Sequence, residues 1–413
     1  MYRPHTHCRA CGYASPGAQG IKSDPKERLI EVFDLGVQPL ANDFCKDDQR
    51  RAGYAPLKVL FCPRCTLAQL SVVVNPEILY RDYPYVTSPS KTMQGHFAKI
   101  AGDIEKIVGK DKSVLEIGSN DGKFLALMRD RGHNVQGIDP AENLAAIANA
   151  AGLPTIVGLF GRGTIQNLPQ PCYDIIIARH VFCHADNWRE FVSGLEVISH
   201  KESLICIEVP YAGDMLADCS FDTVYHEHLS YLSIKSVLAL LNGTRLRLDR
   251  VERYQIHGGA IMLMLRWKQA GINYPENDFG ENITVDDWHQ FATTATHQIA
   301  ELKRTIYSLI AKGKKGKPVA GLGASAKSTV WISACGFTRK EIAFIADNTP
   351  QKQWRFSPGA DIPILDEGAI LRELPDYVVM WAWNYKSEIL QKFDFARSRG
   401  VKFIVPVPSI EIV

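Results

Sequence analysis

The chain has 413 residues, of which 46% are hydrophobic and 22% charged, and its formal net charge is +2. This length predicts two or three domains, and this composition is typical of a soluble globular protein. The near-neutral charge argues against strong attraction to nucleic acid or anionic membranes, and no apolar run is long enough to span a bilayer. The N-terminus lacks the apolar core of a signal peptide. We therefore expect a cytoplasmic protein with reduced cysteines and with neither a membrane nor a nucleic acid as partner.

Two Cys-x-x-Cys pairs mark the N-terminal segment. Cys8 and Cys11 form the first pair, Cys62 and Cys65 form the second, and the 50 residues 12–61 separate them. Each pair lies beside turn-forming residues, so the two thiolates of one tight turn can point at a single ion. In a reducing compartment, ten cysteines favour metal binding over disulfides. We predict a structural Zn²⁺ held by these four sulfurs, with four unbound thiols as the alternative.

The middle segment alternates expected strands and helices. The strands are expected at 113–117, 134–138, 155–157, 173–178 and 203–209, and the helices at 97–108, 123–131 and 142–150. Repeated β-α-β units predict a parallel sheet with helices on both faces.

A glycine-rich turn follows the first of these strands. The residues of the turn that can meet a ligand are Glu116, Gly118, Asn120, Asp121 and Gly122, and the second strand ends at Asp139. The glycines allow a tight turn and close approach of the backbone to a ligand, and an acid after the second strand grips a ribose diol in doubly wound nucleotide folds. The turn resembles the S-adenosylmethionine loop of class I methyltransferases. A dinucleotide fold, or a turn that binds no cofactor, is the alternative.

Four consecutive side chains that can move protons follow: Tyr225, His226, Glu227 and His228. In a helix Tyr225 and His228 would share a face, whereas in a loop all four could surround a pocket. Neutral histidine is a general base near pH 7, glutamate can orient it, and tyrosine can donate a proton to a developing enolate oxygen. His184, beyond the fourth strand, lies where ligands bind in such sheets. A polar patch that caps the next helix is the alternative to a catalytic cluster.

The C-terminal segment repeats the strand–turn–helix pattern. A helix is expected at 284–310 and strands at 319–322, 342–346 and 377–380. The sequence Gly-Leu-Gly-Ala-Ser-Ala-Lys-Ser at 321–328 opens a helix, where backbone amides and Lys327 could hold a diphosphate. The same pattern is a weak dinucleotide signal, so an NAD-dependent dehydrogenase is the alternative for this segment.

Several motifs occur together in one order along nearly the whole chain: the two cysteine pairs, 116–122, Cys183-His184, Tyr225-x-Glu227-His228, His-Gly-Gly at 257–259, and 321–328. This combination resembles the S-adenosylmethionine-dependent C-methyltransferases that act on nucleotide-linked 4-keto-deoxysugars. The resemblance implies an α/β chain of three domains. These are a small zinc-binding domain at 1–78, a class I methyltransferase domain at 79–275, and a Rossmann-like domain at 276–413 that binds the nucleotide-sugar.

The resemblance also implies roles for individual residues. The catalytic residues are His228, Tyr225, Glu227, His184 and a tyrosine of the sequence Tyr83-Pro-Tyr85, in which either tyrosine fits and Tyr83 is preferred. S-adenosylmethionine is held by Glu116, Gly118, Asn120, Asp121, Gly122, Asp139, Pro140 and Phe160. The substrate is held by Tyr85, His257, Gly258, Lys327, Asp347, Lys352 and Asn384. His226 stands at a position that varies within the family.

The implied reaction is methylation at C-3 of a 4-keto-6-deoxysugar linked to dTDP or GDP, by a monomer or weak homo-oligomer. A C–H bond next to a ketone is acidic because the anion delocalises onto the oxygen. We expect His228 to remove the C-3 proton, and Tyr225 or His184 to stabilise the C-4 enolate that attacks the methyl group. The alternatives are a zinc-containing O-methyltransferase acting on a sugar or small metabolite, and a non-catalytic zinc protein that binds nucleic acid.

Overall fold

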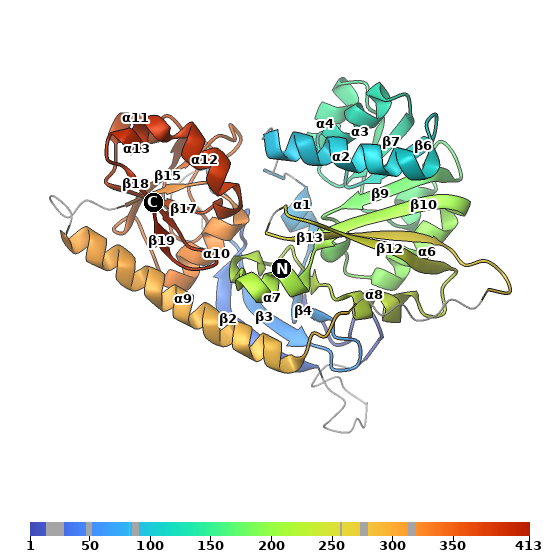
Figure 1. Cartoon of the computed structure of the whole chain (residues 1–413), viewed down its shortest axis with the longest axis horizontal. Coiled ribbons are helices and arrows are strands. Elements are labelled where there is room, and N and C mark those ends of the chain that lie inside the picture. Colours follow the sequence, from blue (N-terminus) through green and yellow to red (C-terminus); the bar gives the residue numbers. More distant parts are fainter. Residues whose placement is uncertain are drawn as a thin grey trace.

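The computed structural model describes residues 1–13, 29–46, 52–81, 83–84, 91–256, 258–272, 280–312 and 319–413. Tyr85 and His257, both expected to bind substrate, lie outside the described residues. Within these ranges the strands form four sheets in three regions of the chain. Figure 1 shows the N-terminal strands in blue, the central sheet in teal to yellow, and the C-terminal sheet in red.

The central region contains a seven-stranded sheet with the order β12-β13-β10-β9-β6-β7-β8. Its strands are β6 (Ser113–Ile117), β7 (Asn134–Asp139), β8 (Thr155–Val157), β9 (Tyr173–Arg179), β10 (Ser199–Pro210), β12 (Leu246–Tyr254) and β13 (Ala260–Trp267). The first five pair in parallel, whereas β13 is antiparallel to both of its neighbours. The five strands that the sequence predicts therefore form a parallel sheet as expected, and β13 and β12, which were not predicted, extend one edge of it in antiparallel pairs. The connection 255–259 between β12 and β13 is too short for the crossover of about a dozen residues that a parallel pair needs.

Helices cover both faces of this sheet. They are α2 (Lys91–Val108), α3 (Lys123–Asp130), α4 (Glu142–Ala150), α5 (Arg162–Ile165), α6 (Trp188–Val197) and α8 (Ile234–Leu241). The short helix α7 (Ala212–Asp218) packs instead in the core that the N-terminal sheet and the C-terminal region share. Successive side chains of a strand point to opposite faces. Accordingly, Val114 belongs to the core that contains buried residues of α2 and α3, and Leu115 to the core that contains those of α6 and α8. The predicted two-sided packing is confirmed.

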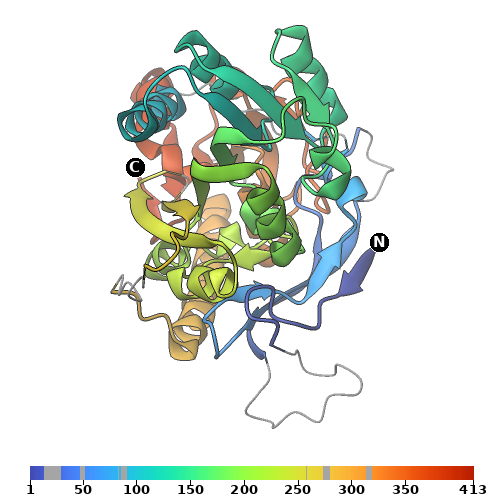
Figure 2. The same cartoon turned by 90° about the vertical axis from the view of Figure 1, so that its right-hand side faces the viewer.

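The N-terminal region is built from short antiparallel strands. They are β1 (Tyr2–Pro4), β2 (Ile30–Pro39), β3 (Tyr54–Phe61), β4 (Ala68–Leu70) and β5 (Val72–Val74), followed by helix α1 (Pro76–Tyr80). The last strand of the sheet β2-β3-β4 is β11 (Ser230–Tyr231), which lies far away in the sequence. Because β11 begins two residues after His228, the N-terminal sheet anchors the chain just beyond the predicted catalytic cluster. Figure 2 shows the N-terminal strands running along one side of the molecule.

The C-terminal region begins with the long helix α9 (Val285–Lys312) and continues as a six-stranded sheet of order β16-β15-β14-β17-β18-β19. Its elements are β14 (Val319–Leu322), α10 (Ala326–Cys335), β15 (Ile342–Asp347), β16 (Ile364–Asp366), α11 (Ala369–Glu373), β17 (Tyr377–Met380), α12 (Lys386–Lys392), α13 (Asp394–Ser398), β18 (Lys402–Val405) and β19 (Glu411–Ile412). Only the β18–β19 pair of this sheet is antiparallel. This confirms the expected Rossmann-like alternation.

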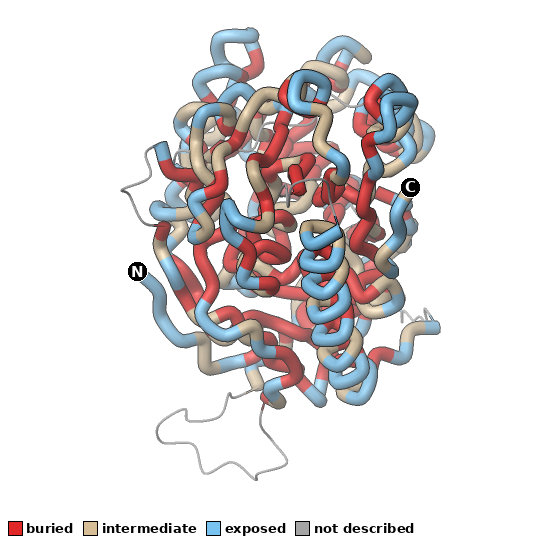
Figure 3. Tube along the Cα trace, turned by 90° about the vertical axis from the view of Figure 1, so that its left-hand side faces the viewer, coloured by how far each residue is buried: buried red, intermediate tan, exposed pale blue. Residues whose placement is uncertain are grey.

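The N-terminal sheet and the C-terminal region share one hydrophobic core. Phe33 of β2 and Phe291 of α9 pack edge to face, with ring centroids 5.2 Å apart. Figure 3 shows the buried parts of the chain in red gathered inside, with exposed stretches on the outside. In the described ranges, no helix combines the length and the apolar character that crossing a bilayer requires.

Candidate active site

The four predicted zinc ligands come together in the N-terminal region. The sulfur atoms of Cys8, Cys11, Cys62 and Cys65 all lie within 4.8 Å of one another, and all four cysteines are free of disulfides. The Cys8–Cys65 sulfur distance is 3.4 Å and the Cys11–Cys62 distance is 3.6 Å. Tetrahedral Zn²⁺ with bonds of about 2.3 Å places its sulfurs about 3.8 Å apart, so these thiols fit a closed structural site.

Each cysteine pair closes a tight turn of the same form. The N–H of Gly12 donates to the carbonyl of Cys8 at 2.9 Å, and the N–H of Thr66 donates to that of Cys62 at 2.8 Å. Both donors have left-handed backbones, with φ of 75° at Gly12 and 61° at Thr66. Glycine takes this conformation without strain.

The zinc site lies against the strand that follows His228. The buried guanidinium of Arg9 donates to the Leu229 carbonyl at 3.2 Å, and the Leu70 N–H donates to the same carbonyl at 3.0 Å. The hydroxyls of Thr66 and Ser233 lie 2.7 Å apart. The metal-binding turns therefore contact the residues that directly follow the predicted catalytic cluster.

The predicted cofactor loop has the backbone shape of a ligand cradle. Gly118, Asn120 and Gly122 have φ values of 70°, 53° and 80°. A Cβ at Gly118 would lie 2.1 Å from Cγ2 of Val181, so only glycine fits there. The Asp139 carboxylate accepts the N–H groups of Asn120 at 2.7 Å and Ala141 at 2.8 Å, which ties the loop to the end of β7.

Several buried polar atoms of this cradle have no partner in the structure. They are Oε2 of Glu116, Oγ of Ser119 and Oδ1 of Asp121. Burial raises the pKa of Glu116 to about 7, although Arg179 opposes the shift by donating to Oε1 at 2.6 Å. Unpaired buried acceptors are costly, and the ammonium group of S-adenosylmethionine can satisfy them. These unpaired acceptors therefore fit this cofactor.

Two further predicted cofactor residues lie near the rim of the sheet. Pro140 follows Asp139 directly and is half-buried. Phe160 follows β8, is half-buried and packs against Phe191 with ring centroids 4.8 Å apart.

The predicted catalytic cluster lies in a turn after the 3-10 helix η2 (Phe221–Thr223), so the loop interpretation is confirmed. Nδ1 of His228 lies 2.8 Å from the Thr223 carbonyl, which can only accept, so Nδ1 carries the proton. Burial lowers the pKa of His228 well below its usual value, and the ring is neutral. Nε2 is then an acceptor, and the Tyr225 hydroxyl donates to it at 2.6 Å.

His184 and a tyrosine that the sequence analysis missed complete the stack of rings beside His228. His184, in the 3-10 helix η1 (Phe182–His184), stacks on His228 with centroids 5.2 Å apart. The ring of Tyr80 in α1 also stacks on His184, with centroids 6.0 Å apart. Burial lowers the pKa of His184 to about 3, and its Nε2 is buried without a hydrogen-bond partner.

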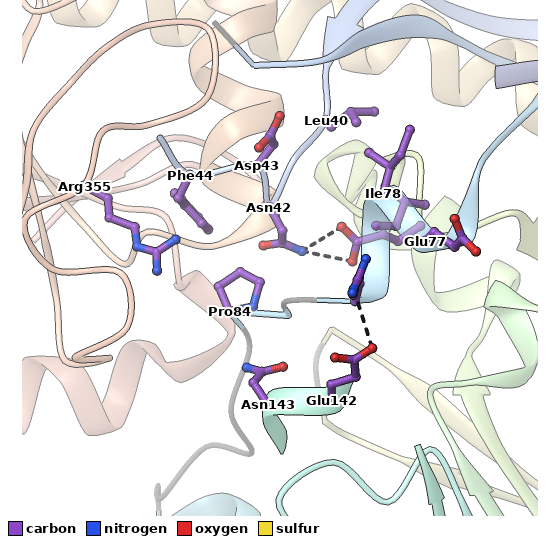
Figure 4. Close-up of a pocket in the computed structure, with 13 residues that line it drawn as sticks. Leu40, Asn42, Asp43, Phe44, Glu77, Ile78, Pro84, Glu142, Asn143 and Arg355 are labelled. Atoms are coloured by element: carbon purple, nitrogen blue, oxygen red, sulfur yellow. Dashed lines mark hydrogen bonds and ion pairs between the residues drawn. The ribbon is translucent and has the colours of Figure 1, made fainter. Parts of the chain in front are cut away.

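Glu227 does not contact His228 through a hydrogen bond, contrary to the expectation that it orients the base. Its carboxylate accepts from the Tyr83 hydroxyl at 2.7 Å and from the Asn42 amide at 2.8 and 2.9 Å. Figure 4 draws the bonds from Asn42 as dashed lines. Burial raises the pKa of Glu227 to about 6, and the bonds from Tyr83 and Asn42 oppose this shift.

Tyr83 is held in place by the central region, while His226 points away from the cluster. The Asn143 side chain forms hydrogen bonds with both backbone groups of Tyr83, at 3.2 and 3.0 Å.

Nε2 of His226 donates to the Ala55 carbonyl at 3.1 Å in the N-terminal sheet. His226 therefore supports the turn and does not form a metal pair with His228.

A cavity of about 490 Å³ opens over Glu227. Figure 4 shows that its lining comes from the N-terminal loop after β2, from α1, from the start of α4 and from the C-terminal region. The lining residues include Asn42, Phe44, Glu77, Arg81, Asn143, Glu227 and Arg355. All three regions of the chain thus contribute to one open cavity.

The predicted substrate residues of the C-terminal region lie at its boundary with the catalytic turn. Lys327 Nζ lies 3.7 Å from Oδ1 of Asp222 and 4.1 Å from the centre of the Trp383 ring. A Cβ at Gly258 would lie 2.8 Å from the same tryptophan. Asn384 follows it in the 3-10 helix η3 (Trp383–Tyr385) and is half-buried.

Asp347 and Lys352 bind the loop that follows β14. Asp347 accepts the Ala324 N–H at 2.7 Å and the Thr349 N–H at 2.8 Å. Lys352 Nζ donates to the Ala324 carbonyl at 2.9 Å. The acid at the end of β15 thus ties down the glycine loop as Asp139 does in the central sheet.

Three stretches of the chain match known protein families. Residues 25–80 match the family described as "Putative zinc binding domain", residues 93–249 the "Methyltransferase domain", and residues 255–408 the "C-methyltransferase C-terminal domain". Their order is the expected one of zinc-binding, methyltransferase and C-terminal domains.

Solved structures resemble the central part at low similarity. The PH0226 protein of Pyrococcus horikoshii is 13% identical, with 47% of this chain and 97% of that chain covered and a TM-score of 0.37. A Burkholderia thailandensis 1,6-didemethyltoxoflavin-N1-methyltransferase with bound S-adenosylhomocysteine is 14% identical, with 43% and 80% covered and a TM-score of 0.33.

A full-length relative decides the family. The chain is 31% identical to the C-methyltransferase NovU of Streptomyces niveus, over 100% of this chain and 98% of that protein. The chain therefore belongs to the family of S-adenosylmethionine-dependent sugar C-methyltransferases that its motifs predict.

Proposed function

We propose that this C-methyltransferase methylates C-3 of a nucleotide-linked 4-keto-6-deoxysugar. The observation that carries the proposal is the state of His228. It is neutral, its Nδ1–H is fixed on the Thr223 carbonyl, and its Nε2 faces the Tyr225 hydroxyl at 2.6 Å. An unprotonated ring nitrogen beside a phenol O–H is suited to removing a proton next to a ketone.

The chain's own groups can carry both halves of the proton transfer. His228 takes the C-3 proton on Nε2, and the Tyr225 O–H turns from Nε2 to the C-4 oxygen, on which negative charge develops. The unpaired Nε2 of His184 lies in the same stack and provides a second polar contact for the sugar. Positioned donors in a dry site stabilise developing charge strongly. When bound, S-adenosylmethionine supplies the electrophilic methyl group.

Cationic side chains at the domain boundary support a diphosphate-containing substrate. Arg355 lines the cavity over Glu227. The charge of Lys352 opposes the burial that raises the pKa of Glu227, and the charge of Lys327 adds to the burial that lowers the pKa of His228. Both charges therefore act on the turn that carries these residues. Planar guanidinium and ammonium groups bind phosphate oxygens well. We propose that the nucleotide diphosphate, of dTDP or GDP, binds at this boundary with the sugar pointing toward His228.

The cysteines also agree with a reducing compartment. The ten cysteines all lie in described parts of the chain and none of them forms a disulfide, and four of them form the zinc site. Thiols persist in the cytoplasm. We therefore propose that the enzyme works there.

The test compares two acceptors that differ only at C-4. The purified enzyme is incubated with S-adenosylmethionine and either a 4-keto-6-deoxy nucleotide sugar or its 4-hydroxy product of borohydride reduction, each as the dTDP and GDP derivative. Mass spectrometry measures the gain of a methyl group, and NMR shows whether it is bonded to C-3. A new C-3 methyl group on the ketone alone supports the proposal. Methylation of an oxygen on the 4-hydroxy sugar would instead establish an O-methyltransferase.

A further inference from the structure

Two tryptophans of the C-terminal region contact the buried carboxylate of Asp222, which lies just before the turn that carries His228. Asp222 lies in η2 and is fully buried. Its Oδ2 accepts the indole N–H of Trp331 at 3.0 Å and that of Trp383 at 2.7 Å. Trp331 belongs to α10 and Trp383 to η3, so both donors come from the C-terminal region. A buried carboxylate oxygen that loses a hydrogen-bond donor is left unsatisfied at a cost of about 1 to 3 kcal/mol, so these two bonds hold η2 firmly.

The next residue along the chain orients the base. The Thr223 carbonyl accepts from Nδ1 of His228 at 2.8 Å. On the other side of Asp222, the ring of Phe221 packs edge-on against Trp331, with centroids 4.3 Å apart. The C-terminal tryptophans therefore hold the two residues that precede Thr223, whose carbonyl decides which nitrogen of His228 carries the proton.

We propose that Asp222 is a positioning residue for the methyl transfer, held by Trp331 and Trp383 so that the Thr223 carbonyl selects the Nδ1–H tautomer of His228. This deepens the proposed function and relies on it for the role of His228 as base. A neutral imidazole exchanges freely between two tautomers, and only one of them leaves Nε2 open toward Tyr225. The C-terminal domain thereby acts on proton abstraction as well as on substrate binding.

Three variants separate this role from general packing. Asp222→Ala removes the acceptor of both indoles, and Trp331→Phe removes one donor while keeping an aromatic ring. Trp381→Phe is the matched control, because Trp381 is fully buried in the same region and its indole N–H has no hydrogen-bond partner. Circular dichroism and thermal unfolding check that each variant folds.

The direct readout is the tautomer of His228, measured by ¹⁵N NMR on histidine-labelled protein, with His228→Gln to assign its signals. The wild type and Trp381→Phe are expected to show a protonated Nδ1 and an unprotonated Nε2. Asp222→Ala and Trp331→Phe are expected to show a mixture of both tautomers. If Asp222→Ala does not fold, Trp331→Phe decides. An unchanged tautomer in Trp331→Phe would overturn the proposal.

The kinetic readout is a split between kcat and KM. A positioned general base contributes about 100- to 10,000-fold to a rate, so partial loss of its tautomer should lower kcat about tenfold or more in Trp331→Phe, with KM for S-adenosylmethionine unchanged. An equal loss in Trp381→Phe would contradict the positioning role. Absence of turnover by the wild type on every nucleotide sugar would contradict the proposed function alone, because the NMR measurement needs no substrate.

Discussion

Tyr225 and His228 share a hydrogen bond of 2.6 Å in which the phenol donates to the unprotonated Nε2 of the ring. The pair is three residues apart in a turn, and two further contacts constrain His228. The ring is fixed by the Thr223 carbonyl, and it stacks on His184. The proposed base, His228, and the proposed acid, Tyr225, are thus positioned before substrate arrives. This lowers the entropic cost of reaching the reactive geometry.

Replacement of His228 by glutamine should abolish methyl transfer without abolishing cofactor binding. Glutamine can keep the polar contacts of the ring but cannot take a proton, and loss of a general base costs about 100- to 10,000-fold in rate. Radiolabelled methyl transfer measures the rate, and calorimetry measures the affinity for S-adenosylmethionine. Tyr225→Phe should fall between this variant and the wild type, because the base remains while the donor to the enolate is lost. A His228→Gln enzyme with full kcat would refute the assignment of the base.

The activity should depend on the ionisation of Glu227. Its folded-state pKa is raised to about 6, and both carboxylate oxygens accept hydrogen bonds, which is the pattern of the ionised form. We expect kcat/KM to rise with pH through about 6. Burial lowers the pKa of His184 to about 3 and that of His228 well below its usual value, so we do not expect the rise to come from these rings.

Tyr83→Phe tests the origin of this pH dependence. The Tyr83 hydroxyl stabilises the Glu227 carboxylate, so its removal should raise the pKa and move the inflection to higher pH. Tyr54→Phe, which alters an exposed tyrosine, is the control and should leave the inflection where it is. An inflection that stays near pH 6 in Tyr83→Phe would show that another group titrates there.

Gly118→Ala should prevent cofactor binding. The new Cβ would lie 2.1 Å from Val181, and the backbone has a φ of 70°. Gly152→Ala is a matched control, because Gly152 has a φ of 73° but no atom within 4 Å of the added Cβ. Both variants should lose about 1 kcal/mol of stability from backbone strain, and only Gly118→Ala should lose affinity for S-adenosylmethionine in calorimetry. Equal affinities would mean that the cradle does not contact the cofactor.

Loss of the zinc ion should inactivate the enzyme by releasing the segment that directly follows His228. The metal-binding turns hold the Leu229 carbonyl through Arg9, and structural zinc sites contribute about 10 kcal/mol or more to folding. Cys62→Ser should therefore lower the zinc content measured by plasma mass spectrometry, the melting temperature and the methyl transfer rate together. Cys172→Ser alters a cysteine outside the cluster and should change none of these. An active zinc-free enzyme would contradict this support role.

Local patterns in the sequence were sufficient to place many elements. Strands β6, β8, β14 and β17 and helix α4 have the expected bounds, because each is a short apolar or amphipathic run between turn residues. Other ends were wrong by several residues. Helix α2 begins at Lys91 and not at residue 97, and β10 extends from Ser199 to Pro210. Such ends depend on packing against distant elements, as the antiparallel strand β13 also does.

The site was predictable where a motif carries its own chemistry. The four cysteines, the Gly118–Gly122 loop and the Tyr225–His228 segment were all identified in advance. Tyr80 and Asn42 were missed because their partners, His184 and Glu227, lie more than a hundred residues away in sequence. The same distance hid the contacts of Asp222 with two tryptophans, which no local spacing indicates.

The most direct test of the account is hydrogen exchange at C-3 of the sugar in the absence of a methyl donor. The enzyme is incubated in heavy water with a 4-keto-6-deoxy nucleotide sugar and S-adenosylhomocysteine, and mass spectrometry follows the entry of deuterium. The account predicts exchange at C-3 with wild-type enzyme and none above background with His228→Gln. Methyl transfer to C-3 together with wild-type exchange in His228→Gln would contradict the account, because another group would then be the base.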